Sequence, residues 1–301
     1  MPITKFKGTG VALITPFHKD GRIHFKSLEN LLEHVITNKV NYLVPLGTTA
    51  ESATLTKDER SAVLGFVKEI NNKRLPIVYG LGGNNTQEII GQIRNTDFEN
   101  IDAILSVCPY YNKPTQKGIY QHYKMIAMAS PVPVILYNVP GRTGTNMTAE
   151  TTLALAHDIE NIIGIKEASG NLEQCMMILK DRPKDFLVIS GDDALTYPLI
   201  ALGGEGVISV VANALPKEFA EMVRMALQGK YASARDLHFK LMEVIPLLFQ
   251  EGNPSGIKAA LNILGICPDH LRLPLVHVSK TLYNQLSVQL KHITENVSNP
   301  G

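Results

Sequence analysis

Eight short apolar runs recur along the chain, and a stretch with helical character follows each of them. The runs occupy residues 10–15, 42–46, 77–81, 103–108, 133–138, 162–166, 186–190 and 206–211, and their starts lie roughly 20 to 35 residues apart. Runs that are nearly all apolar and rich in Val, Ile and Leu are typical of parallel strands buried on both faces. This spacing suits strand–loop–helix units joined by right-handed crossovers. The pattern therefore predicts an α/β fold, a (β/α)8 TIM barrel.

Helix starts lie where the barrel needs them. The sequence TKDE at residues 56–59 has the capping-box pattern and precedes an amphipathic run that ends at Ile70. The sequence NLEQ at residues 171–174 is the amide variant of the same pattern. A doubly wound sheet is the main alternative, but no Gly-x-Gly-x-x-Gly turn follows the first run.

The pattern changes after Asn213, because apolar strand runs stop and helical periodicity continues. Residues from about 230 to 293 are predicted to form three helices, the first of them kinked at Pro246. Pro254 marks a helix start, and Gly265 with Pro268 marks the end of the second helix. We therefore expect a catalytic barrel over residues 1–229 and a C-terminal three-helix appendage over residues 230–301.

Composition and charge narrow the class of protein. The 301 residues are 45% hydrophobic, and 29 basic against 28 acidic side chains give a formal charge of +1. This balance excludes a nucleic-acid-binding footprint and a polybasic membrane signal. The first residues carry no targeting pattern, and no apolar run approaches membrane-spanning length. Three scattered cysteines favour a reducing compartment, so we expect a cytoplasmic protein.

The most informative stretch is IIGIKEASG at residues 162–170, a short apolar run that ends in a lysine and a turn. Alternation along a strand places Gly164 and Lys166 on one face and Ile163 and Ile165 on the other. Lys166 would then lie at the carboxyl end of a strand, where a barrel carries its chemistry. A lysine in a partly desolvated pocket can attack a carbonyl as a free amine. The alternative is a lysine that merely ends a strand.

Other loops after the predicted strands carry groups suited to the same chemistry. Residues 47–52 read GTTAES and offer hydroxyls and backbone N–H groups for a carboxylate. Residues 109–114 read PYYNKP, and residues 137–144 read YNVPGRTG, with a phenol that can pass a proton and an arginine that can bind a carboxylate. Taken singly, each has an ordinary explanation as a cap, a packing residue or a surface cation.

Residues 190–193 read SGDD and could suggest a metal site. The two acids lack a third ligand at suitable spacing, and the nine histidines form no metal-ligand motif. We interpret Asp192 and Asp193 as turn residues, with Gly191 giving a backbone contact, and we predict no metal.

The convergence of these groups at the ends of different strands predicts an active site that forms an imine with a keto acid. In this hypothesis Lys166 is the amine and Tyr137 the proton carrier. Thr48, Thr49 and Arg142 bind carboxylate groups.

The four motifs at residues 47–52, 109–114, 137–143 and 164–167 together resemble the dihydrodipicolinate synthase family of pyruvate-dependent class I aldolases. The resemblance runs from Gly8 to beyond Leu264. Two positions depart from the family pattern: Ala50 stands where glycine is usual, and Cys108 where threonine is frequent. The resemblance implies condensation of pyruvate with L-aspartate 4-semialdehyde to 4-hydroxy-tetrahydrodipicolinate, in the diaminopimelate route to lysine.

The resemblance also implies roles for individual residues. Lys166 would form the imine without a cofactor, and Arg142 would bind the semialdehyde carboxylate. A relay of Thr49, Tyr137 and Tyr111 would move protons, with Tyr111 supplied by a neighbouring subunit of a homo-oligomer, expected as a dimer of dimers. Gly191 and Ile208 would give backbone contacts to substrate.

Lysine-sensitive members of the family bind L-lysine in a crevice at the dimer interface. The corresponding positions here are Ser52, Ala53, Lys57, Arg60, Asn84, Glu88 and Tyr110. Glu88 would bind an ammonium group, whereas Lys57 and Arg60 would either repel it or hold the carboxylate.

Two other functions stay open at this point. One is a related pyruvate lyase that cleaves sialic acid or a sugar acid, which would not need the Arg142 turn. The other is a non-catalytic metabolite-sensing barrel, which would be expected to lack Lys166 or Tyr137.

Overall fold

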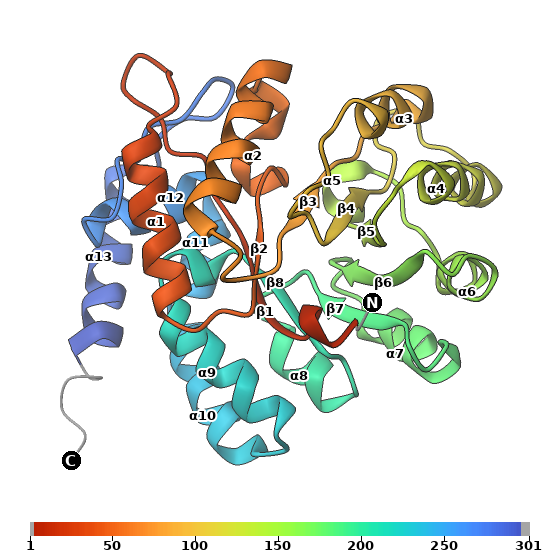
Figure 1. Ribbon diagram of the computed structural model, residues 1–301. Helices are drawn as coiled ribbons and strands as arrows, with labels where there is room; N and C mark the ends of the chain where they lie inside the picture. The colour runs from red at the N-terminus through yellow and green to blue at the C-terminus, as the bar shows by residue number, and fades with distance from the viewer. Residues whose placement is uncertain (1–2, 296–301) are drawn as a thin grey trace.

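Parallel strands form a nearly closed ring at the centre of the molecule, with helices around it (Figure 1). The computed structural model describes residues 3–295. The strand order is β2-β1-β8-β7-β6-β5-β4-β3, and every one of these ladders is parallel. An isolated parallel bridge between Leu43 and Ile77 joins the two ends of the sheet. The predicted (β/α)8 barrel is confirmed.

Within the described range the strands are β1 (Gly8–Ala12), β2 (Tyr42–Val44), β3 (Val78–Gly80), β4 (Ala103–Val107), β5 (Val134–Asn138), β6 (Ile162–Glu167), β7 (Leu187–Ser190) and β8 (Gly206–Ser209). The helices of the barrel are α1 (Phe25–Thr37), α2 (Lys57–Asn71), α3 (Thr86–Arg94), α4 (Gln116–Ala129), α5 (Pro140–Thr143), α6 (Ala149–Asp158), α7 (Leu172–Asp181), α8 (Thr196–Ala201) and α9 (Pro216–Leu227). Short 3-10 helices are η1 (Ile3–Phe6), η2 (Thr48–Ala50), η3 (Ser52–Thr54) and η4 (Val211–Asn213).

The first strand begins earlier than its apolar run predicts. Pairing of β1 with β8 starts at Gly8, opposite Gly206. A Cβ on Gly206 would lie 2.1 Å from the Gly8 carbonyl oxygen, so this close approach requires glycine. Beyond β1, the Ile14 N–H donates to the Asn213 side chain at 3.2 Å instead of continuing the ladder. Backbone contacts therefore set the strand bounds, and hydrophobicity does not reveal them.

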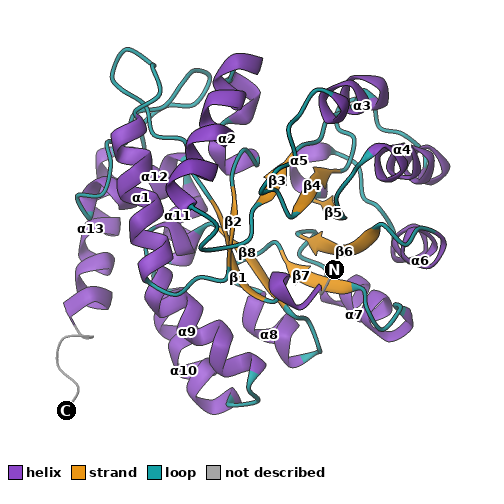
Figure 2. Ribbon diagram, in the orientation of Figure 1, coloured by secondary structure: helices purple, strands orange, loops and turns teal. Residues whose placement is uncertain are grey.

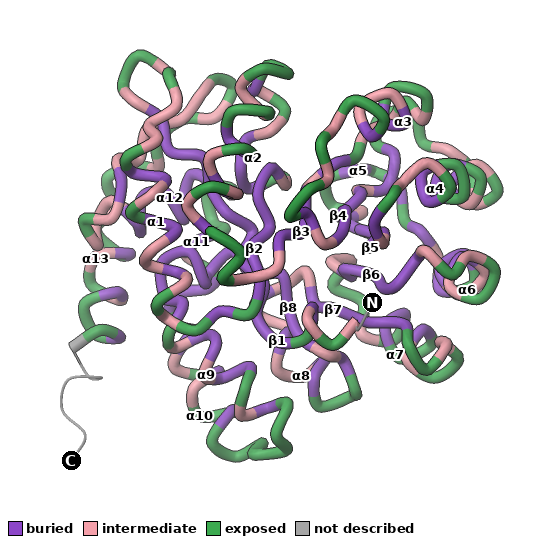
Figure 3. Tube along the Cα trace, in the orientation of Figure 1, coloured by how far each residue is buried: buried purple, intermediate pink, exposed green. Residues whose placement is uncertain are grey.

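Two apolar layers hold the barrel together. Figure 2 shows the strands in orange with the helices around them, and Figure 3 shows that the strands are mostly buried. One fills the interior of the ring, with Val44, Leu105, Ile135 and Ile189 among its side chains. The other lies between the strands and the surrounding helices. Burial on both faces explains why the strands appear in the sequence as continuous apolar runs.

A β-bulge changes the facing of residues in β6. The ladder with β5 pairs Val134 with Ile162 and then Ile135 with Gly164, so Ile163 is left over. Ile163 consequently lies in the interior layer, whereas Ile165 lies in the outer layer. The prediction that these two isoleucines share a face was wrong, because one extra residue reverses the alternation.

One of the two predicted capping boxes forms completely, and the other forms only in part. The capping box at the start of α2 is confirmed, because Thr56 and Glu59 exchange side-chain and backbone hydrogen bonds. Asn171 caps α7 through a bond from the Gln174 N–H. The Gln174 side chain does not complete a box, because its amide donates to Glu167 at 2.9 Å.

The C-terminal segment contains four described helices instead of the predicted three: α10 (Tyr231–Met242), α11 (Ile245–Gln250), α12 (Ser255–Ile263) and α13 (Lys280–Glu295). Pro246 does not kink a long helix. It lies in the first turn of α11, where its missing N–H breaks no helical hydrogen bond. Helix α10 packs beside α9, and α13 packs beside α12. The division of the chain at residue 230 stays a prediction.

No helix among the described residues combines the length and the apolar character that crossing a membrane requires.

A fully buried ion pair joins the C-terminal helices to the barrel. Lys258 Nζ of α12 lies 2.5 Å from Glu51 Oε1, and both side chains are 0% exposed. The Arg272 N–H donates to the other Glu51 oxygen at 3.1 Å, and Lys258 also donates to the His270 carbonyl at 2.9 Å. Burial lowers the pKa of Lys258 below its usual value, and the Glu51 carboxylate opposes that change. Each of the two buried charges therefore needs the other as its counter-charge.

Replacing one partner tests this dependence. We expect Lys258→Ala to lower the free energy of unfolding by about 3–5 kcal/mol, because Glu51 would stay buried without a counter-charge. Denaturant unfolding measures the change. The control is Arg224→Ala, which breaks an exposed pair with Glu221 and should cost less than about 1 kcal/mol. The double variant Glu51→Gln/Lys258→Met should be more stable than Lys258→Ala, because it leaves no unpaired charge buried. A cost for Lys258→Ala equal to that of the control would contradict the argument.

Candidate active site

Lys166 lies at the carboxyl end of β6 with 5% of its surface exposed, and it lines a cavity of about 470 Å³. Its Nζ atom lies 4.3 Å from the centre of the Tyr137 ring. The two residues are ladder partners on β6 and β5, so their side chains leave the sheet on the same face. The structure thus brings together the predicted amine and the predicted proton carrier.

Gly191 leaves room for the Lys166 side chain. A Cβ at this position would lie 3.0 Å from Lys166 Cε and 2.6 Å from Ala168 Cβ. The Gly191 N–H donates to the Glu167 carbonyl at 2.7 Å, which fixes the turn after β7 against the end of β6. Gly191 therefore shapes the cavity through the side chain that it lacks.

The residue after Lys166 holds the strand end in place. Glu167 is 3% exposed and accepts hydrogen bonds from the Asn138 side chain, the Gln174 side chain and the Ser169 N–H at 3.0, 2.9 and 2.7 Å. These donors come from the ends of β5 and β6 and from α7. With its carboxylate anchored outside the ring, Glu167 keeps Lys166 turned inward.

Thr48 and Thr49 form the predicted turn after β2, in the 3-10 helix η2. Thr49 is buried, and its Oγ1 accepts a hydrogen bond from Asn253 Nδ2 at 3.0 Å. Glu51, which ends this turn, has a φ of 55°, a left-handed conformation that is costly for a residue with a side chain. The buried pair with Lys258 holds Glu51 there, so the same pair fixes the threonine turn.

Arg142 lies in α5, on the turn predicted for it, and lines the cavity together with Lys166 and Thr48. Its Nη2 donates to the Asn253 carbonyl at 3.2 Å, which orients the guanidinium. Arg142 also lines a second hollow of about 450 Å³ that Tyr110 and Arg60 border. The two hollows therefore adjoin, and Thr48, Tyr137 and Arg142 line both of them.

Asn253 is a site residue that the sequence analysis missed. It precedes α12, is 8% exposed, and contacts both Thr49 and Arg142. Its Oδ1 atom is buried and has no hydrogen-bond partner among the described residues. The Gly252-Asn253-Pro254 turn was the available signal, but it indicates only a helix start. Phe249 of the C-terminal segment forms part of the same wall.

The structure does not bring every predicted residue into this cavity. Ile208 belongs to the interior apolar layer, and Val210 lines the cavity near the end of β8. Tyr111 is 90% exposed, has a φ of 71°, and does not line the cavity formed by its own chain. A left-handed backbone conformation is costly for a residue with a side chain, so the conformation of Tyr111 is a strained one.

The two aspartates after Gly191 differ from each other. Asp192 is a turn residue as predicted, because its carboxylate accepts the Ala194 N–H at 2.9 Å. Asp193 does more: it is 3% exposed and accepts the backbone N–H groups of Val210 and Val211 at 3.0 and 3.1 Å. Burial raises the pKa of Asp193 to about 6. It thereby ties the end of β8 to the end of β7.

The two departures from the family pattern fit the structure without strain. Ala50 is buried inside η2, and its φ is not in the left-handed region that would favour glycine. Cys108 is buried, and burial raises the pKa of its thiol to about 12. Its N–H donates to the Tyr137 carbonyl at 2.8 Å, a backbone contact that most residue types could make.

The predicted effector positions other than Asn84 line two adjoining hollows. Ser52, Ala53 and Tyr110 line the hollow beside Arg142, whereas Lys57 and Glu88 line a groove of about 520 Å³ between α2 and α3. Arg60 lines both.

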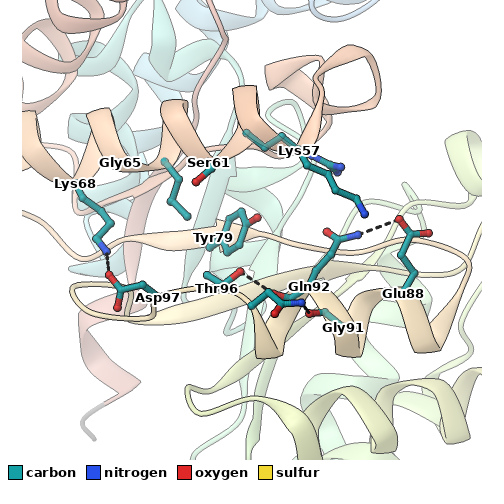
Figure 4. A pocket seen from close by; sticks show the side chains of 13 residues that line it. Lys57, Ser61, Gly65, Lys68, Tyr79, Glu88, Gly91, Gln92, Thr96 and Asp97 are labelled. Carbon is teal, nitrogen blue, oxygen red and sulfur yellow. Dashed lines mark hydrogen bonds and ion pairs between the residues drawn. The ribbon is translucent and has the colours of Figure 1, made fainter.

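Figure 4 shows this groove from close by. Lys57 extends from α2 toward Glu88 and Gln92 of α3, and Tyr79 lies between the two helices. Gln92 donates to Glu88 at 3.2 Å, and the Lys68–Asp97 ion pair lies at the other end of the groove. Asn84 does not line it; its side chain donates to the Tyr110 carbonyl at 3.0 Å.

The cavity at the strand ends is suited to covalent chemistry on a small carboxylic acid. Lys166 supplies an amine, Tyr137 a phenol beside it, and Thr48 with Thr49 hydroxyl groups on the opposite turn. Arg142 adds a guanidinium that can bind a carboxylate through two hydrogen bonds. Leu105 of β4, Val210 just after β8, and Phe249 of α11 add apolar side chains to the walls of the cavity.

Comparisons with known proteins agree with this geometry. A family model described as the dihydrodipicolinate synthetase family matches residues 5–293. The 4-hydroxy-tetrahydrodipicolinate synthase of Flavobacterium psychrophilum is 53% identical over 290 residues, 96% of this chain and 99% of that protein.

Two solved structures have the same fold. The dihydrodipicolinate synthase of Cyanidioschyzon merolae with lysine bound has a TM-score of 0.91 and 40% identity, over 95% of this chain and 98% of that one. The chloride-inhibited enzyme of Acinetobacter baumannii complexed with pyruvate has a TM-score of 0.92 and 41% identity, with the same coverage. The chain belongs to the dihydrodipicolinate synthetase family.

Proposed function

We propose that the protein is a lyase that condenses pyruvate with L-aspartate 4-semialdehyde to give 4-hydroxy-tetrahydrodipicolinate, in the diaminopimelate route to lysine. The observation that carries the proposal is the buried Lys166 amine beside the Tyr137 phenol, in a cavity that Arg142 also lines. Relatives with this activity in their names cover nearly the whole chain. The Arg142 turn favours this reaction over cleavage of sialic acid or a sugar acid.

The chemistry needs no bound cofactor. The Lys166 amine attacks the ketone carbon of pyruvate, and loss of water gives an imine. Removal of a methyl proton makes an enamine, whose carbon attacks the aldehyde carbon of the second substrate. The amino group of that substrate then attacks the imine carbon and closes the ring, which releases Lys166. Each step moves a proton, and we assign these transfers to Tyr137 with Thr49.

Reductive trapping tests the covalent step. We expect borohydride with pyruvate to add a stable mass to a peptide that contains Lys166, because reduction converts the imine to a secondary amine. Lys166→Ala should lose the label and nearly all activity. Peptide mass spectrometry identifies the site, and Lys113→Ala, on the exposed tyrosine loop, is the matched control. A label on another lysine would refute the assignment.

Substrate choice tests the rest of the proposal. Pyruvate consumption should require aspartate 4-semialdehyde, and sugar aldehydes should not replace it. Arg142→Lys should raise the KM for the semialdehyde more than the KM for pyruvate, because lysine cannot form the two-bond carboxylate contact. Activity with sugar aldehydes alone would favour the alternative lyase.

We further propose that the active form is at least a dimer and that Tyr111 completes the proton relay in a neighbouring subunit. Its 90% exposure and its left-handed backbone support this role. Two hydrogen bonds hold the loop that presents Tyr111. The Asn84 side chain donates to the Tyr110 carbonyl, and the Asn112 side chain donates to the Asn84 carbonyl. A dimer of dimers is the expected assembly.

Mixing two inactive variants tests the shared site. Tyr111→Phe chains combined with Lys166→Ala chains should regain part of the activity, because hybrid dimers contain one site with both residues intact. Light scattering gives the assembly size, and isotopic mass labelling of one variant verifies that subunits exchange. Exchange without recovery of activity would count against a shared site.

We also propose that L-lysine inhibits the enzyme from the hollows that Arg60 borders. Glu88 supplies a carboxylate for an ammonium group, and Lys57 with Arg60 supplies cations for the lysine carboxylate. The relative from Cyanidioschyzon merolae was solved with lysine bound. Filling these hollows could change the position of Tyr110 and hence of Tyr111, which gives a physical route for coupling.

An activity titration tests inhibition. L-lysine should lower activity in the parent protein, and Glu88→Ala should weaken inhibition by about tenfold or more, because an ammonium group loses its carboxylate. Glu69→Ala, on the same helix as Lys57 but away from the groove, is the control. Full activity at saturating lysine would sink the proposal. Unchanged inhibition of Glu88→Ala would locate the site elsewhere.

A further inference from the structure

A group of metal-ligating side chains lies in the loop between α12 and α13, apart from the cavity around Lys166. Asp269, His270 and His277 each offer one ligand atom, and these three atoms lie within 4.8 Å of one another. His277 Nδ1 and Asp269 Oδ2 are 3.1 Å apart, and the two imidazole rings have centres 5.7 Å apart. The sequence spacing matched no metal motif, because the loop brings His277 back to Asp269 and His270, which lie eight and seven positions earlier.

We propose that these three residues bind one divalent zinc ion. Two imidazoles and a carboxylate are ordinary zinc ligands, and a water molecule can occupy the fourth position. Ligand atoms at about 2.1 Å from a tetrahedral ion lie about 3.4 Å apart. The carboxylate and His277 already have nearly that separation. The His277 side chain is 54% exposed, so its ring can rotate to close the remaining gap.

The position of this group suggests what the ion does. The His270 carbonyl accepts a hydrogen bond from Lys258, and the Arg272 N–H donates to Glu51. The loop is therefore attached on its inner side to the buried pair that fixes the threonine turn. A zinc ion would join the part of this loop around Asp269 and His270 to its far end at His277. It would restrain the loop without entering the active-site cavity.

The guanidinium of Arg272 extends the inner attachment. It donates to the carbonyl groups of Gly21 and Thr54 and forms an ion pair with Glu59. The hydrogen bond from Arg272 lowers the pKa of Glu59 to about 2. Because Arg272 lies between the two histidines, the proposed ligands are carried on a loop whose backbone is already ordered.

Other zinc ligands in the chain are less suitable. Cys108, Cys175 and Cys267 are buried, and burial raises the pKa of each thiol to about 12, which disfavours the thiolate that zinc needs. His18 and His24 stack with ring centres 4.0 Å apart, but they belong to no ligand group of three. Over residues 3–295, the Asp269 group is the single cluster of this kind.

The ordinary alternative is an ion pair between Asp269 and protonated His277 at the surface. Such a surface pair contributes little to the stability of the fold and has no affinity for zinc beyond that of scattered histidines. The two explanations therefore differ in stoichiometry, in affinity, and in which histidines matter.

Metal titration of the full chain tests the proposal. The protein carries no polyhistidine tag and is freed of metal by chelator and dialysis. Isothermal titration with Zn²⁺ should give one ion per chain with a Kd below about 10 µM, a value within reach of a partly ordered three-ligand site. Co²⁺ in place of Zn²⁺ should give visible absorption bands, which Zn²⁺ then removes. Thermal unfolding should shift upward with Zn²⁺, because the ion binds the folded chain.

Variants decide which residues bind the ion. His270→Ala and His277→Ala should each lower zinc affinity at least about 10–100-fold and remove the thermal shift. His292→Ala, which removes an exposed histidine from α13, should change neither. If an alanine variant unfolds, Asp269→Asn and His277→Gln replace it in the test, because they keep a side chain of similar size.

Three results would overturn the proposal. They are a Kd above about 1 mM, unchanged affinity in His277→Ala, and half an ion per chain with a larger assembly in light scattering. The last would mean that the ion joins two copies of the chain. Pyruvate trapping at Lys166 does not involve this loop, so failure of the zinc site and failure of the proposed function can be told apart.

Discussion

The buried contact between Glu51 and Lys258 is the constraint on which the rest of the site depends. Neither charge reaches solvent, so neither is tolerable without the other. One partner ends the turn that carries Thr48 and Thr49, and the other lies on α12 in the C-terminal segment. The barrel and the appended helices must therefore assemble together. The threonine turn therefore needs the C-terminal helices in place, and the same helices form one wall of the cavity.

The cavity consequently has two kinds of wall. Strand ends supply the Lys166 amine and the Tyr137 phenol, which are paired residues on neighbouring strands. The C-terminal segment supplies Asn253, which contacts Thr49 through its amide and Arg142 through its carbonyl. A single residue outside the barrel thus relates the threonine turn to the arginine turn. Barrel geometry alone would leave these two turns independent of each other.

The sequence predicted most of what depends on local pattern. Apolar runs located all eight strands of the described range. The rule that chemistry lies at strand ends predicted a site with Lys166 and Tyr137, and the structure places the two side chains beside each other. What the sequence missed depends on contacts between distant residues. The bulge at Ile163 is set by pairing with β5, and the buried role of Asp193 by the backbone after β8. Asn253 becomes a site residue only once α12 has packed against the barrel.

The incomplete ladder between β2 and β3 has a consequence for motion. This seam is held by the bridge of Leu43 with Ile77 and by a hydrogen bond from the Gly80 N–H to the Pro45 carbonyl at 3.0 Å. Gly80 lies so close to Leu46 that a Cβ would be 2.6 Å from its backbone. A junction with few hydrogen bonds opens locally at a lower free energy than a full ladder. We therefore expect this seam to open more readily than the rest of the barrel, and Leu46 and Gly80, on its two sides, both line the hollow that Tyr110 borders.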